Sequence, residues 1–499
     1  MKNNFYITTP IYYVNDIPHI GHAYTTILAD VIARYQRSLD KNVFFLTGLD
    51  EHGQKVQDAA NKNKTDPLSH CNNMSKRFTD LWGKLHISNN DFIRTTQKRH
   101  IKVVQNILNE VMKNGDIYED EYEGLYSVSE ERFITEKEAD TGNFHDIKKL
   151  KEKNYFFKMS KYQKNLIDHI HSNPQFIMPS HRKNEIIGFL NNPLNDLCIS
   201  RPKSRLSWGI ELPFDSDYVT YVWFDALINY ITAPGYLENQ NNFEKFWPAN
   251  IHLIGKDILT THAVYWPTML LSAGIALPKT IFAHGWWLTG DDKMSKSKGN
   301  VINPMDLIDV YGVDPVRYYL MREMVLGQDA NFTVESFNNR YNSDLANDFG
   351  NLLSRISTLI NKNFNGIIPD ISSYGEEESK IEKNAEKLII KYDELMNRFL
   401  LNEAIEEVFQ YIRSINRYFE HKAPWKLVKE NLSDAANVLY VGSQALIICS
   451  ILLHPIMPNR VKKLLDVFNV KSKDKTWGSL PVGSKLAAHQ PLFPRIKSN

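Results

Sequence analysis

The stretch Thr9-Pro10-Ile11-Tyr12-Tyr13-Val14-Asn15-Asp16-Ile17-Pro18-His19-Ile20-Gly21-His22 lies between two segments of contrasting pattern. The apolar run before it, residues 5–8, predicts a buried strand, and the periodic residues 23–37 predict a helix. A strand that leads directly into a helix is the repeating unit of an open α/β sheet, and such sheets bind ligands where their strands end. The stretch therefore predicts a ligand site at a strand-to-helix turn.

Three residues of this turn suit a phosphate group. His19 and His22 can hold phosphate oxygens, and Gly21 between them allows a ligand to approach the backbone closely. The backbone amides at a helix N-terminus also point towards any anion that binds there. The pattern alone fits a plain helix start equally well, so the rest of the chain must decide.

The composition is that of a globular protein. The chain has 499 residues, of which 42% are hydrophobic and 12% aromatic, and this length predicts about two to four domains. Its 59 basic and 58 acidic residues give a net charge of +1. Any surface that binds nucleic acid must therefore be a local patch, since the chain has no global positive field.

Cysteine usage and the absence of apolar leaders indicate a reducing compartment. Cys71, Cys198 and Cys449 lie far apart, which excludes a disulfide framework and a four-cysteine zinc site. The first residues lack the patterns of a signal or transit peptide, and we find no run of about 18 apolar residues. The sequence therefore predicts a cytoplasmic protein without a membrane span.

Strand and helix patterns alternate after the first helix. A second buried strand, residues 43–48, ends in Leu49-Asp50-Glu51-His52-Gly53, and a helical pattern starts at Gln54. Asp50 thus lies at the same edge of the predicted sheet as His19, where it can serve as a helix cap or bind an amine. Further helices are predicted over residues 66–84 and 97–113, and further strands over residues 218–223, 251–257 and 280–285.

A different kind of sequence interrupts this alternation. Residues 118–128 predict short antiparallel strands, charged and irregular sequence continues to about Lys153, and residues 154–213 predict a small α+β unit. Beyond Val310 only helical patterns remain. The predicted fold class is therefore α/β, a doubly wound parallel-sheet (Rossmann-like) catalytic domain split by an α+β insertion and followed by an α-helical bundle.

These patterns predict four segments. The first half of the sheet domain spans residues 1–115, and the insertion spans residues 116–217. The second half of the sheet domain, with a linker to the bundle, spans residues 218–333, and the helical bundle spans residues 334–499.

A second phosphate candidate lies in Asp291-Asp292-Lys293-Met294-Ser295-Lys296-Ser297-Lys298-Gly299-Asn300. Its lysines alternate with small polar residues and it has no apolar face. One interpretation is a solvated basic turn. The other is a mobile clamp whose ammonium groups neutralise a polyphosphate.

The two candidates together resemble a known pair of motifs. His19-Ile20-Gly21-His22 resembles the HIGH motif of class I aminoacyl-tRNA synthetases, and Lys293-Met294-Ser295-Lys296-Ser297 matches every letter of their KMSKS motif. A specified pentapeptide arises by chance in roughly one chain in several thousand. Within the class, the resemblance is closest to the methionyl-tRNA synthetase family and runs along nearly the whole chain, carried by residues 9–15, 48–53, 208–210, 222–226, 255–257, 423–425 and 491–496.

The resemblance implies a two-step reaction. L-methionine and ATP with Mg²⁺ would give methionyl-adenylate and pyrophosphate, and methionine would then pass to the 3′ end of its tRNA. The catalytic residues implied are His19, His22, Lys293 and Lys296. The ATP-binding residues implied are His19, Gly21, His22, Gly255, Asp257, Lys293, Ser295 and Lys296. The methionine-binding residues implied are Ile11, Tyr13, Asp50, Trp223, Ala226, Leu227, Tyr230 and His262.

The implied residue types suit these substrates. Attack on the α-phosphate builds negative charge, so correct placement and positive charge supply most of the catalysis. Aromatic rings suit a polarizable thioether, and Asp50 can pair with the α-ammonium of methionine. Each aromatic residue taken singly, Trp223 or Tyr230 for example, fits plain core packing as well.

In the bundle, the resemblance implies that the tRNA anticodon is read by Asn351, Arg355 and Trp425. Asn351 and Arg355 are four residues apart, so they share a helix face, and an aromatic ring can stack on an unpaired base. The alternatives are a surface charge for Arg355 and a buried anchor for Trp425.

One departure from the family concerns zinc. Many members carry Cys-x-x-Cys knuckles in the insertion, where this chain has residues 126–131 without cysteine. A thiolate zinc knuckle is therefore excluded, and we expect no structural zinc. Because the C-terminal extension that dimerises some members is absent, we also expect a monomer.

Three alternative functions remain to be weighed: another class I synthetase, a non-catalytic tRNA-binding protein and a small adenylyltransferase. A synthetase for isoleucine, valine or leucine usually carries an editing domain, which the roughly 270 residues between the two motifs leave no room for. The cysteine enzyme needs a thiolate zinc site. A non-catalytic tRNA-binding protein would not need intact His19, His22, Lys293 and Lys296, and a small adenylyltransferase would not need the bundle.

Overall fold

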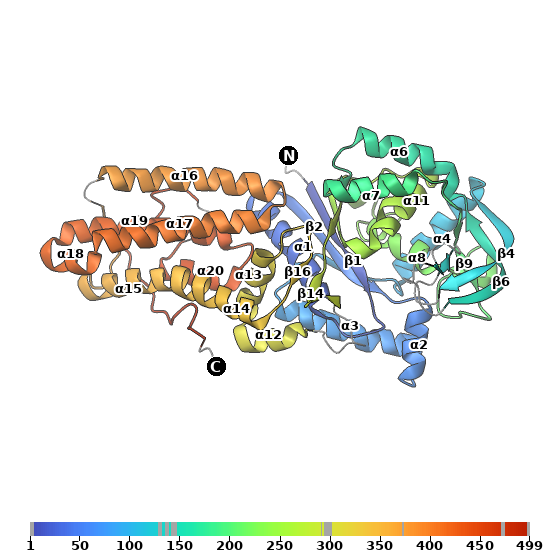
Figure 1. Cartoon of the computed structure of the whole chain (residues 1–499), viewed down its shortest axis with the longest axis horizontal. Helices are drawn as coiled ribbons and strands as arrows, with labels where there is room; N and C mark the ends of the chain where they lie inside the picture. The colour runs from blue at the N-terminus through green and yellow to red at the C-terminus, as the bar shows by residue number, and fades with distance from the viewer. Residues whose placement is uncertain are drawn as a thin grey trace. The chain divides into compact units, whose positions relative to one another are not determined.

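The computed structural model describes residues 4–127, 132–134, 139–140, 147–290, 292–293, 302–371, 374–470 and 475–496 (Figure 1). By its internal contacts the chain divides into two compact units. The first comprises Met1–Pro18 with Asp40–His284, and the second comprises His19–Leu39 with Gly285–Asn499. The helix that follows the opening stretch therefore belongs to the second unit, although the strand before it belongs to the first.

The first unit is built on a six-stranded sheet in which every neighbouring pair is parallel. Its order is β3-β2-β1-β12-β13-β7, so the chain starts in the middle, runs outward to β3, and later adds β12 and then β13 on the other side of β1, beyond which the earlier strand β7 forms the edge. This is the predicted doubly wound arrangement, which binds ligands at the strand ends where the order reverses, here between β1 and β12. The strands are β3 (Asp91–Arg94), β2 (Asn42–Asp50), β1 (Asn4–Tyr13), β12 (Ile251–Gly255), β13 (Ile281–His284) and β7 (Ile177–Met178).

The opening stretch extends the predicted strand beyond Thr8. β1 continues to Tyr13, and its pairing with β2 shifts in register between Thr8 and Ile11. Pro10 lies at this irregularity, because it has no N–H to donate to the neighbouring strand. After the shift Ile11 and Tyr13 lie on one face of the strand, and Tyr12 packs on the other against Phe78, with ring centroids 5.9 Å apart.

Helices connect and cover these strands, as the periodic patterns predict. Asp66 caps α3 by accepting a hydrogen bond from the backbone N–H of Ser69, and a proline occupies the first turn of that helix. The helical segments of the first unit outside the insertion are α2 (Gln54–Lys62), α3 (Pro67–Lys84), α4 (Lys98–Lys113), α8 (Val222–Leu227), α9 (Asn229–Thr232), α10 (Gln240–Phe246), η2 (Lys256–Ile258), the π-helical η3 (Thr261–Tyr265) and α11 (Trp266–Ser272).

The insertion contains an antiparallel sheet of order β5-β4-β6-β8. The charged sequence before Lys153, expected to be irregular, forms much of β6 from Ile147 onwards. Lysines of β6 pair with glutamates of β4 across the two strands, which stabilises a strand that has no apolar alternation there. The elements are β4 (Ile117–Ser127), β5 (Arg132–Ile134), β6 (Ile147–Phe157), η1 (Met159–Tyr162), α6 (Gln163–Ser172), α7 (Ser180–Leu190) and β8 (Leu197–Cys198).

One strand predicted for the parallel sheet does not belong to it. Residues 218–223 were expected to rejoin that sheet, but β11 (Asp215–Thr220) lies between β10 (Glu211–Leu212) and β9 (Ser200–Pro202) in a small antiparallel sheet. The chain then enters α8 at Val222. Residues of the insertion such as Phe157 and Ile199 share one hydrophobic core with Phe224 and Ile254 of the sheet domain.

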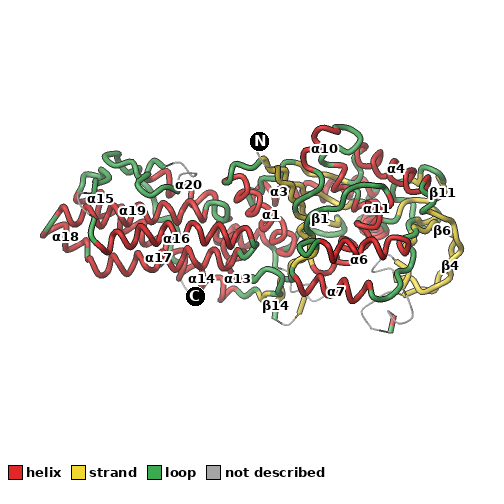
Figure 2. The backbone as a smooth tube through the Cα atoms, turned by 90° about the horizontal axis from the view of Figure 1, so that it is seen from above, coloured by secondary structure: helices red, strands yellow, loops and turns green. Residues whose placement is uncertain are grey.

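The second unit is largely helical, as predicted, and in both views α16, α17 and α19 run side by side (Figures 1 and 2). Residues 341–350 form a π-helical segment, η5 (Tyr341–Gly350), between two α-helices. The helices are α1 (Ile20–Ser38), α12 (Pro304–Tyr311), α13 (Val313–Glu323), α14 (Val334–Arg340), α15 (Asn351–Asn363), α16 (Glu376–Asn397), α17 (Leu401–Lys422), α18 (Pro424–Glu430), α19 (Leu432–Leu453) and α20 (Pro458–Val467). Three short strands accompany them, β14 (Trp287–Thr289), β15 (Asp292–Lys293) and β16 (Ala330–Asn331).

A buried ion pair joins α1 to the helices that close the bundle. Arg317 of α13 is fully buried and donates to Asp30 of α1 at 2.7 Å, to the carbonyl of Pro455 at 3.0 Å and to that of Ile456 at 2.8 Å. Asp30 also accepts from Arg34 at 2.7 Å. All these groups are satisfied by partners, which a buried charge requires.

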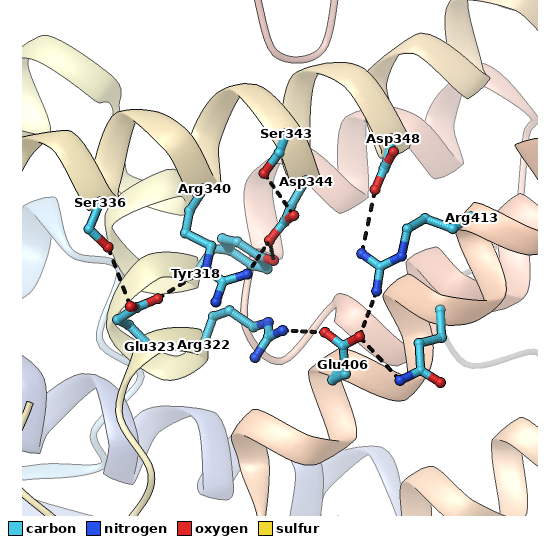
Figure 3. Close-up of polar contacts among 11 residues, drawn as sticks. Tyr318, Arg322, Glu323, Ser336, Arg340, Ser343, Asp344, Asp348, Glu406 and Arg413 are labelled. Carbon is cyan, nitrogen blue, oxygen red and sulfur yellow. Dashed lines mark hydrogen bonds and ion pairs between the residues drawn. The ribbon is translucent and has the colours of Figure 1, made fainter.

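Charged side chains also fasten the start of the bundle to α13 (Figure 3). Glu406 of α17 accepts from Arg322 and, at 2.6 Å, from Arg413. The hydroxyl of Tyr318 donates to Asp344 of η5 at 2.7 Å. These bonds link three helical segments that are not consecutive in the chain, α13, η5 and α17.

α19 is strongly apolar, and its residues from Ala435 to Leu453 are all buried. Among the described residues, it is the one helix with the length and hydropathy of a membrane span. Its apolar window is entirely buried within the bundle, which is typical of the core helix of a helical domain.

Candidate active site

The two histidines of the opening stretch form the N-terminal cap of α1. His19 is the cap residue, and its Nδ1 accepts from the backbone N–H of Gly21 at 3.0 Å. His22 Nδ1 accepts in turn from the backbone N–H of His19 at 3.1 Å. Because each neutral ring accepts through Nδ1, each carries its proton on Nε2. The turn thus presents two imidazole N–H donors held by the backbone.

The spacing of these residues leaves no room for a side chain at Gly21. A Cβ there would lie 2.9 Å from Cε1 and 3.1 Å from Nδ1 of His19. The rings of His19 and His22 lie 3.9 Å apart between centroids. Burial, with a further contribution from His19, lowers the pKa of His22 well below its usual value, so His22 is a neutral donor near pH 7.

Described residues on both sides of the second motif contact the same helix. β14 pairs with β15, which places the backbone of Lys293 opposite Leu288, and Trp287 of β14 packs edge-on against Tyr24 of α1 with centroids 6.0 Å apart. On the far side of the loop, the carbonyl of Ile302 accepts from the backbone N–H of Ile20 at 3.3 Å. The side chain of Lys293, and Ser295 and Lys296 entirely, lie outside the described residues.

At the centre of the first unit's sheet, Gly255 ends β12 and Asp257 follows in η2. A Cβ on Gly255 would lie 2.6 Å from Asp257 Oδ1, so this position needs glycine for the carboxylate to fold back over the strand end. β12 is the neighbour of β1 at the point where the strand order reverses. Gly255 and Asp257 therefore lie at the edge where a doubly wound sheet binds its ligand.

Aromatic residues of the predicted methionine set form a continuous chain of ring contacts. Tyr13 meets Trp223 at 6.3 Å and 83°, and Trp223 meets His262 at 6.1 Å and 80°. Tyr230 lies 5.7 Å from His262 between centroids. Edge-to-face rings of this kind make an apolar wall with defined geometry.

The hydrogen bonds of His262 fix its tautomer. Its Nδ1 lies 2.9 Å from the carbonyl of Ile258, which can only accept, so Nδ1 carries the proton. Nε2 is then an acceptor, and the hydroxyl of Tyr230 donates to it at 2.8 Å. Burial lowers the pKa of His262 to about 4, so the ring is neutral near pH 7.

The remaining residues of that set lie in the same unit. Asp50 is buried at the end of β2, where the strand register places it opposite Tyr13. Ile11 is half-buried on the face of β1 that carries Tyr13. Ala226 and Leu227 are buried in α8, one turn after Trp223. All eight predicted residues therefore come from β1, the end of β2, α8, α9 and η3.

The structure adds polar residues that sequence reasoning missed. His252 of β12 stacks on Tyr230 with centroids 4.2 Å apart, accepts from Trp266 Nε1 at 3.3 Å and contacts Thr8 Oγ1 through Nδ1 at 2.9 Å. Burial lowers its pKa well below the usual value. Nothing in the local pattern around His252 could have identified it, because its partners come from three other segments.

A buried carboxylate shared by two histidines was also missed. Asp225 of α8 accepts from His52 Nδ1 and from His100 Nε2, each at 2.6 Å. All three side chains are buried. In the sequence, Asp225 was identified only as one of residues 222–226, which carry the family resemblance.

In the bundle, two of the three predicted anticodon residues lie in contact. The guanidinium of Arg355 lies 4.9 Å from the ring centroid of Trp425 and pairs with Glu420 at 2.9 Å. Trp425 is 36% exposed, so its ring is available to solvent rather than a buried anchor. Asn351 is exposed one turn before Arg355 on α15.

Within the described ranges, no group of three or more histidine, cysteine or acidic side chains is arranged to hold a metal ion. Cys71, Cys198 and Cys449 are all buried and carry no disulfide. The described candidate residues form two groups, the imidazoles of His19 and His22 in the second unit and the aromatic rings with Asp50 in the first unit.

Comparisons with known proteins agree along the whole chain. The family model described as tRNA synthetases class I (M) matches residues 5–142 and 141–357, and the model described as anticodon binding domain of methionyl tRNA ligase matches residues 368–499. The methionine–tRNA ligase of Fusobacterium nucleatum is 45% identical, over 100% of this chain and 80% of its own. That of Rickettsia typhi is 44% identical, over 99% of this chain and 100% of its own.

Solved structures show the same similarity. The methionyl-tRNA synthetase of Mycobacterium tuberculosis in complex with methionyl-adenylate matches with a TM-score of 0.95 at 37% identity, over 99% of this chain and 100% of that chain. Its free form matches with a TM-score of 0.88 at 35% identity, over 100% of this chain and 99% of that chain.

Proposed function

Because the chain belongs to the methionyl-tRNA ligase family of class I tRNA synthetases, we propose specific roles for its residues in the family's reaction. The chain is a methionine–tRNA ligase, which activates methionine with ATP to methionyl-adenylate and pyrophosphate and then charges tRNA. The observation that carries the assignment of roles is the attachment of both phosphate motifs to one helix. The backbone N–H of Ile20 donates to the carbonyl of Ile302, and Tyr24 packs on Trp287, so described residues before and after the loop that contains Lys296 both contact α1.

We assign the phosphates of ATP to the start of α1 and to the loop. The methionine carboxylate attacks the α-phosphorus, the bond to the pyrophosphate oxygen breaks, and the electron pair leaves with pyrophosphate. His19 and His22 donate from Nε2 to phosphate oxygens, while Lys293 and Lys296 supply positive charge to the leaving group. No protein nucleophile is needed, because placement and charge stabilisation account for catalysis of phosphoryl chemistry of this kind.

ATP enters as its Mg²⁺ complex, whose metal is held by phosphate oxygens and water in preference to a protein cage. We assign nucleotide binding to Gly255, Asp257 and Ser295. Gly21 lets the nucleotide approach the backbone closely. We propose that the protein has no structural zinc, because no cysteine lies between Cys71 and Cys198 and zinc knuckles are built on thiolates. Stoichiometric zinc in the purified protein would contradict this.

Methionine is assigned to the first unit's pocket. Asp50 pairs with the α-ammonium group, and Trp223, Tyr13 and Ile11 face the apolar side chain together with Ala226 and Leu227. Tyr230 and His262 form the polar end towards the thioether. Since Tyr230 donates to His262 in this structure, its hydroxyl oxygen keeps lone pairs and must rotate its proton to donate to sulfur.

We assign recognition of the anticodon to Asn351, Arg355 and Trp425. Single-stranded bases are read by hydrogen bonds to their edges and by stacking on aromatic or arginine planes. Trp425 offers an exposed ring, and Arg355 lies over it. The acceptor end of the same tRNA is assigned to the catalytic half.

The remaining assignments follow the sequence. We propose catalytic segments at residues 1–115 and 218–333, an insertion at 116–217 and an anticodon-binding bundle at 334–499. We further propose a cytoplasmic monomer, which gel filtration with light scattering would test. A stable dimer at micromolar concentration would contradict it.

The decisive experiment is amino-acid-dependent ATP–pyrophosphate exchange. Exchange with methionine, and none with isoleucine or cysteine, is the expected result. K296A is expected to slow adenylate formation far more than it weakens methionine binding, because the lysine acts on charge that develops in the transition state. Equal losses in both would refute the role of the loop as a clamp.

A further inference from the structure

Asp225 stands at the junction of three segments of the first unit. Its Oδ2 accepts from His52, which follows the end of β2, and its Oδ1 accepts from His100 of α4, with both distances 2.6 Å. His100 also contacts the hydroxyl of Thr232 in α9 at 3.3 Å. Burial opposes ionisation of Asp225, but the two imidazoles outweigh it and hold the pKa of this carboxyl below its usual value.

The segment that carries His52 is the one that carries Asp50. Asp50 is fixed on one side by its pairing opposite Tyr13. Glu51 is fixed next to it, because its Oε1 accepts from Arg94 at 2.6 Å and its carbonyl accepts from Trp208 Nε1 at 2.5 Å. The hydrogen bond from His52 to Asp225 attaches this segment to α8.

One face of α8 carries pocket residues, and another face carries Asp225. Trp223, Ala226 and Leu227 are three or four residues apart and so share a face, and Trp223 contacts Tyr13 and His262 through its ring. Asp225 is two residues from Trp223 and projects from a different face. A shift or rotation of α8 relative to the end of β2 would therefore change the separation between Asp50 and the aromatic wall.

We propose that Asp225 is a positioning residue for substrate selection: through His52 it sets the distance between the carboxylate that binds the α-ammonium of methionine and the rings that bind its side chain. The inference rests on the methionine-binding roles proposed above. It concerns the amino acid alone, so ATP binding should not depend on it. His100 holds the other oxygen of Asp225 but belongs to α4, which contributes no residue to the pocket.

The test compares D225N, H52Q, H100Q and D50N in the full-length chain. H100Q is the matched control, because it leaves the same buried carboxylate with one lost partner but keeps the bond to His52. The readouts are the KM for methionine and for ATP in pyrophosphate exchange, with active-site titration to count folded enzyme. Inhibition constants are measured for 3-(methylthio)propylamine, which has the amine, and for 4-(methylthio)butanoate, which lacks it.

D225N and H52Q should each raise the KM for methionine about tenfold, the range for losing a hydrogen bond to a charged group, with the KM for ATP unchanged. Their effects should not add in the double variant, because both break one bond. Both should weaken the amine inhibitor more than the amine-free acid. H100Q should keep a KM for methionine close to that of the parent, even if it unfolds at a lower temperature.

Several results would overturn the proposal. One is a D225N or H52Q enzyme that keeps the parent KM for methionine and loses activity only because fewer active sites are titrated. Equal weakening of the two inhibitors, or an H100Q enzyme as impaired for methionine as H52Q, would do the same. If D50N leaves the KM for methionine unchanged, the role proposed for Asp50 fails and the inference with it. If D50N loses binding while D225N does not, only the inference fails.

Discussion

Replacing Gly21 by alanine should separate catalysis from stability. The added Cβ would lie 2.9 Å from His19 Cε1, well inside ordinary carbon contact, so the ring must move by about half an ångström or more and its bond from Gly21 N–H is lost. Losing that cap costs about 1 kcal/mol, while alanine within a helix gains about 0.5–1 kcal/mol over glycine. The stability should therefore change little. The displaced His19 ring would no longer place its Nε2–H donor at the phosphates of ATP. The rate of pyrophosphate exchange should therefore fall about tenfold to a hundredfold.

The assay is methionine-dependent pyrophosphate exchange, together with thermal unfolding of the same preparations. The KM for methionine should stay at the parent value, since no methionine-binding residue moves. Gly83 is the matched control: it lies in α3, where a Cβ would meet no atom within 4 Å, so G83A should be fully active. A G21A enzyme with exchange within about twofold of the parent, the range of a surface substitution, would refute the role given to the His19 ring.

Three further predictions concern other parts of the chain. W425A should weaken tRNA charging by about 1–3 kcal/mol per stacked base while exchange stays intact, and W425F should recover charging; parallel loss of exchange would mean that the ring only supports the fold. The unfolded chain protonates His262 near pH 6.5 and the folded chain only near pH 4, so unfolding takes up a proton in this window and stability falls as pH drops from 6.5 to 4. H262Q should flatten that slope in urea titrations at pH 5 and 7, and an unchanged slope would show that other groups cause it. D30N leaves the Arg317 guanidinium buried without its counter-charge and should cost about 3–5 kcal/mol, of which the double variant D30N/R317M regains part; additive losses in guanidinium titrations would contradict the pairing.

The presence of the central strands and of the two motifs follows from the sequence, because both depend on short-range signals. The run before Thr9, the periodic α1 and the strand at 251–255 each carry their own hydrophobic pattern. The pocket residues Trp223 and His262 were identified by resemblance to a family rather than by pattern. Their side chains do lie in one chain of ring contacts.

The rest depends on contacts between distant segments. The lysine-rich part of β6 is a strand because it pairs with β4, whose glutamates form ion pairs with those lysines. The apolar run 218–223 is divided between the end of β11, which pairs with β9, and the start of α8, since a short apolar run specifies neither its structure nor its partner. Asp225, His52 and His100 are 48 to 173 residues apart, and only the folded chain shows that the two histidines are hydrogen-bonded to Asp225.

The packing of α1 has a consequence for synthesis of the protein. This helix emerges early from the ribosome, yet the arginine that pairs with Asp30 comes 287 residues later, and the partner of Tyr35 at Asp393 comes 358 residues later. At about 5–20 residues per second, α1 waits about 15–60 s for Arg317 and longer for Asp393. Fourteen of its residues are buried only in the finished chain, so nascent chains should need a chaperone at this segment more than at any strand that pairs locally.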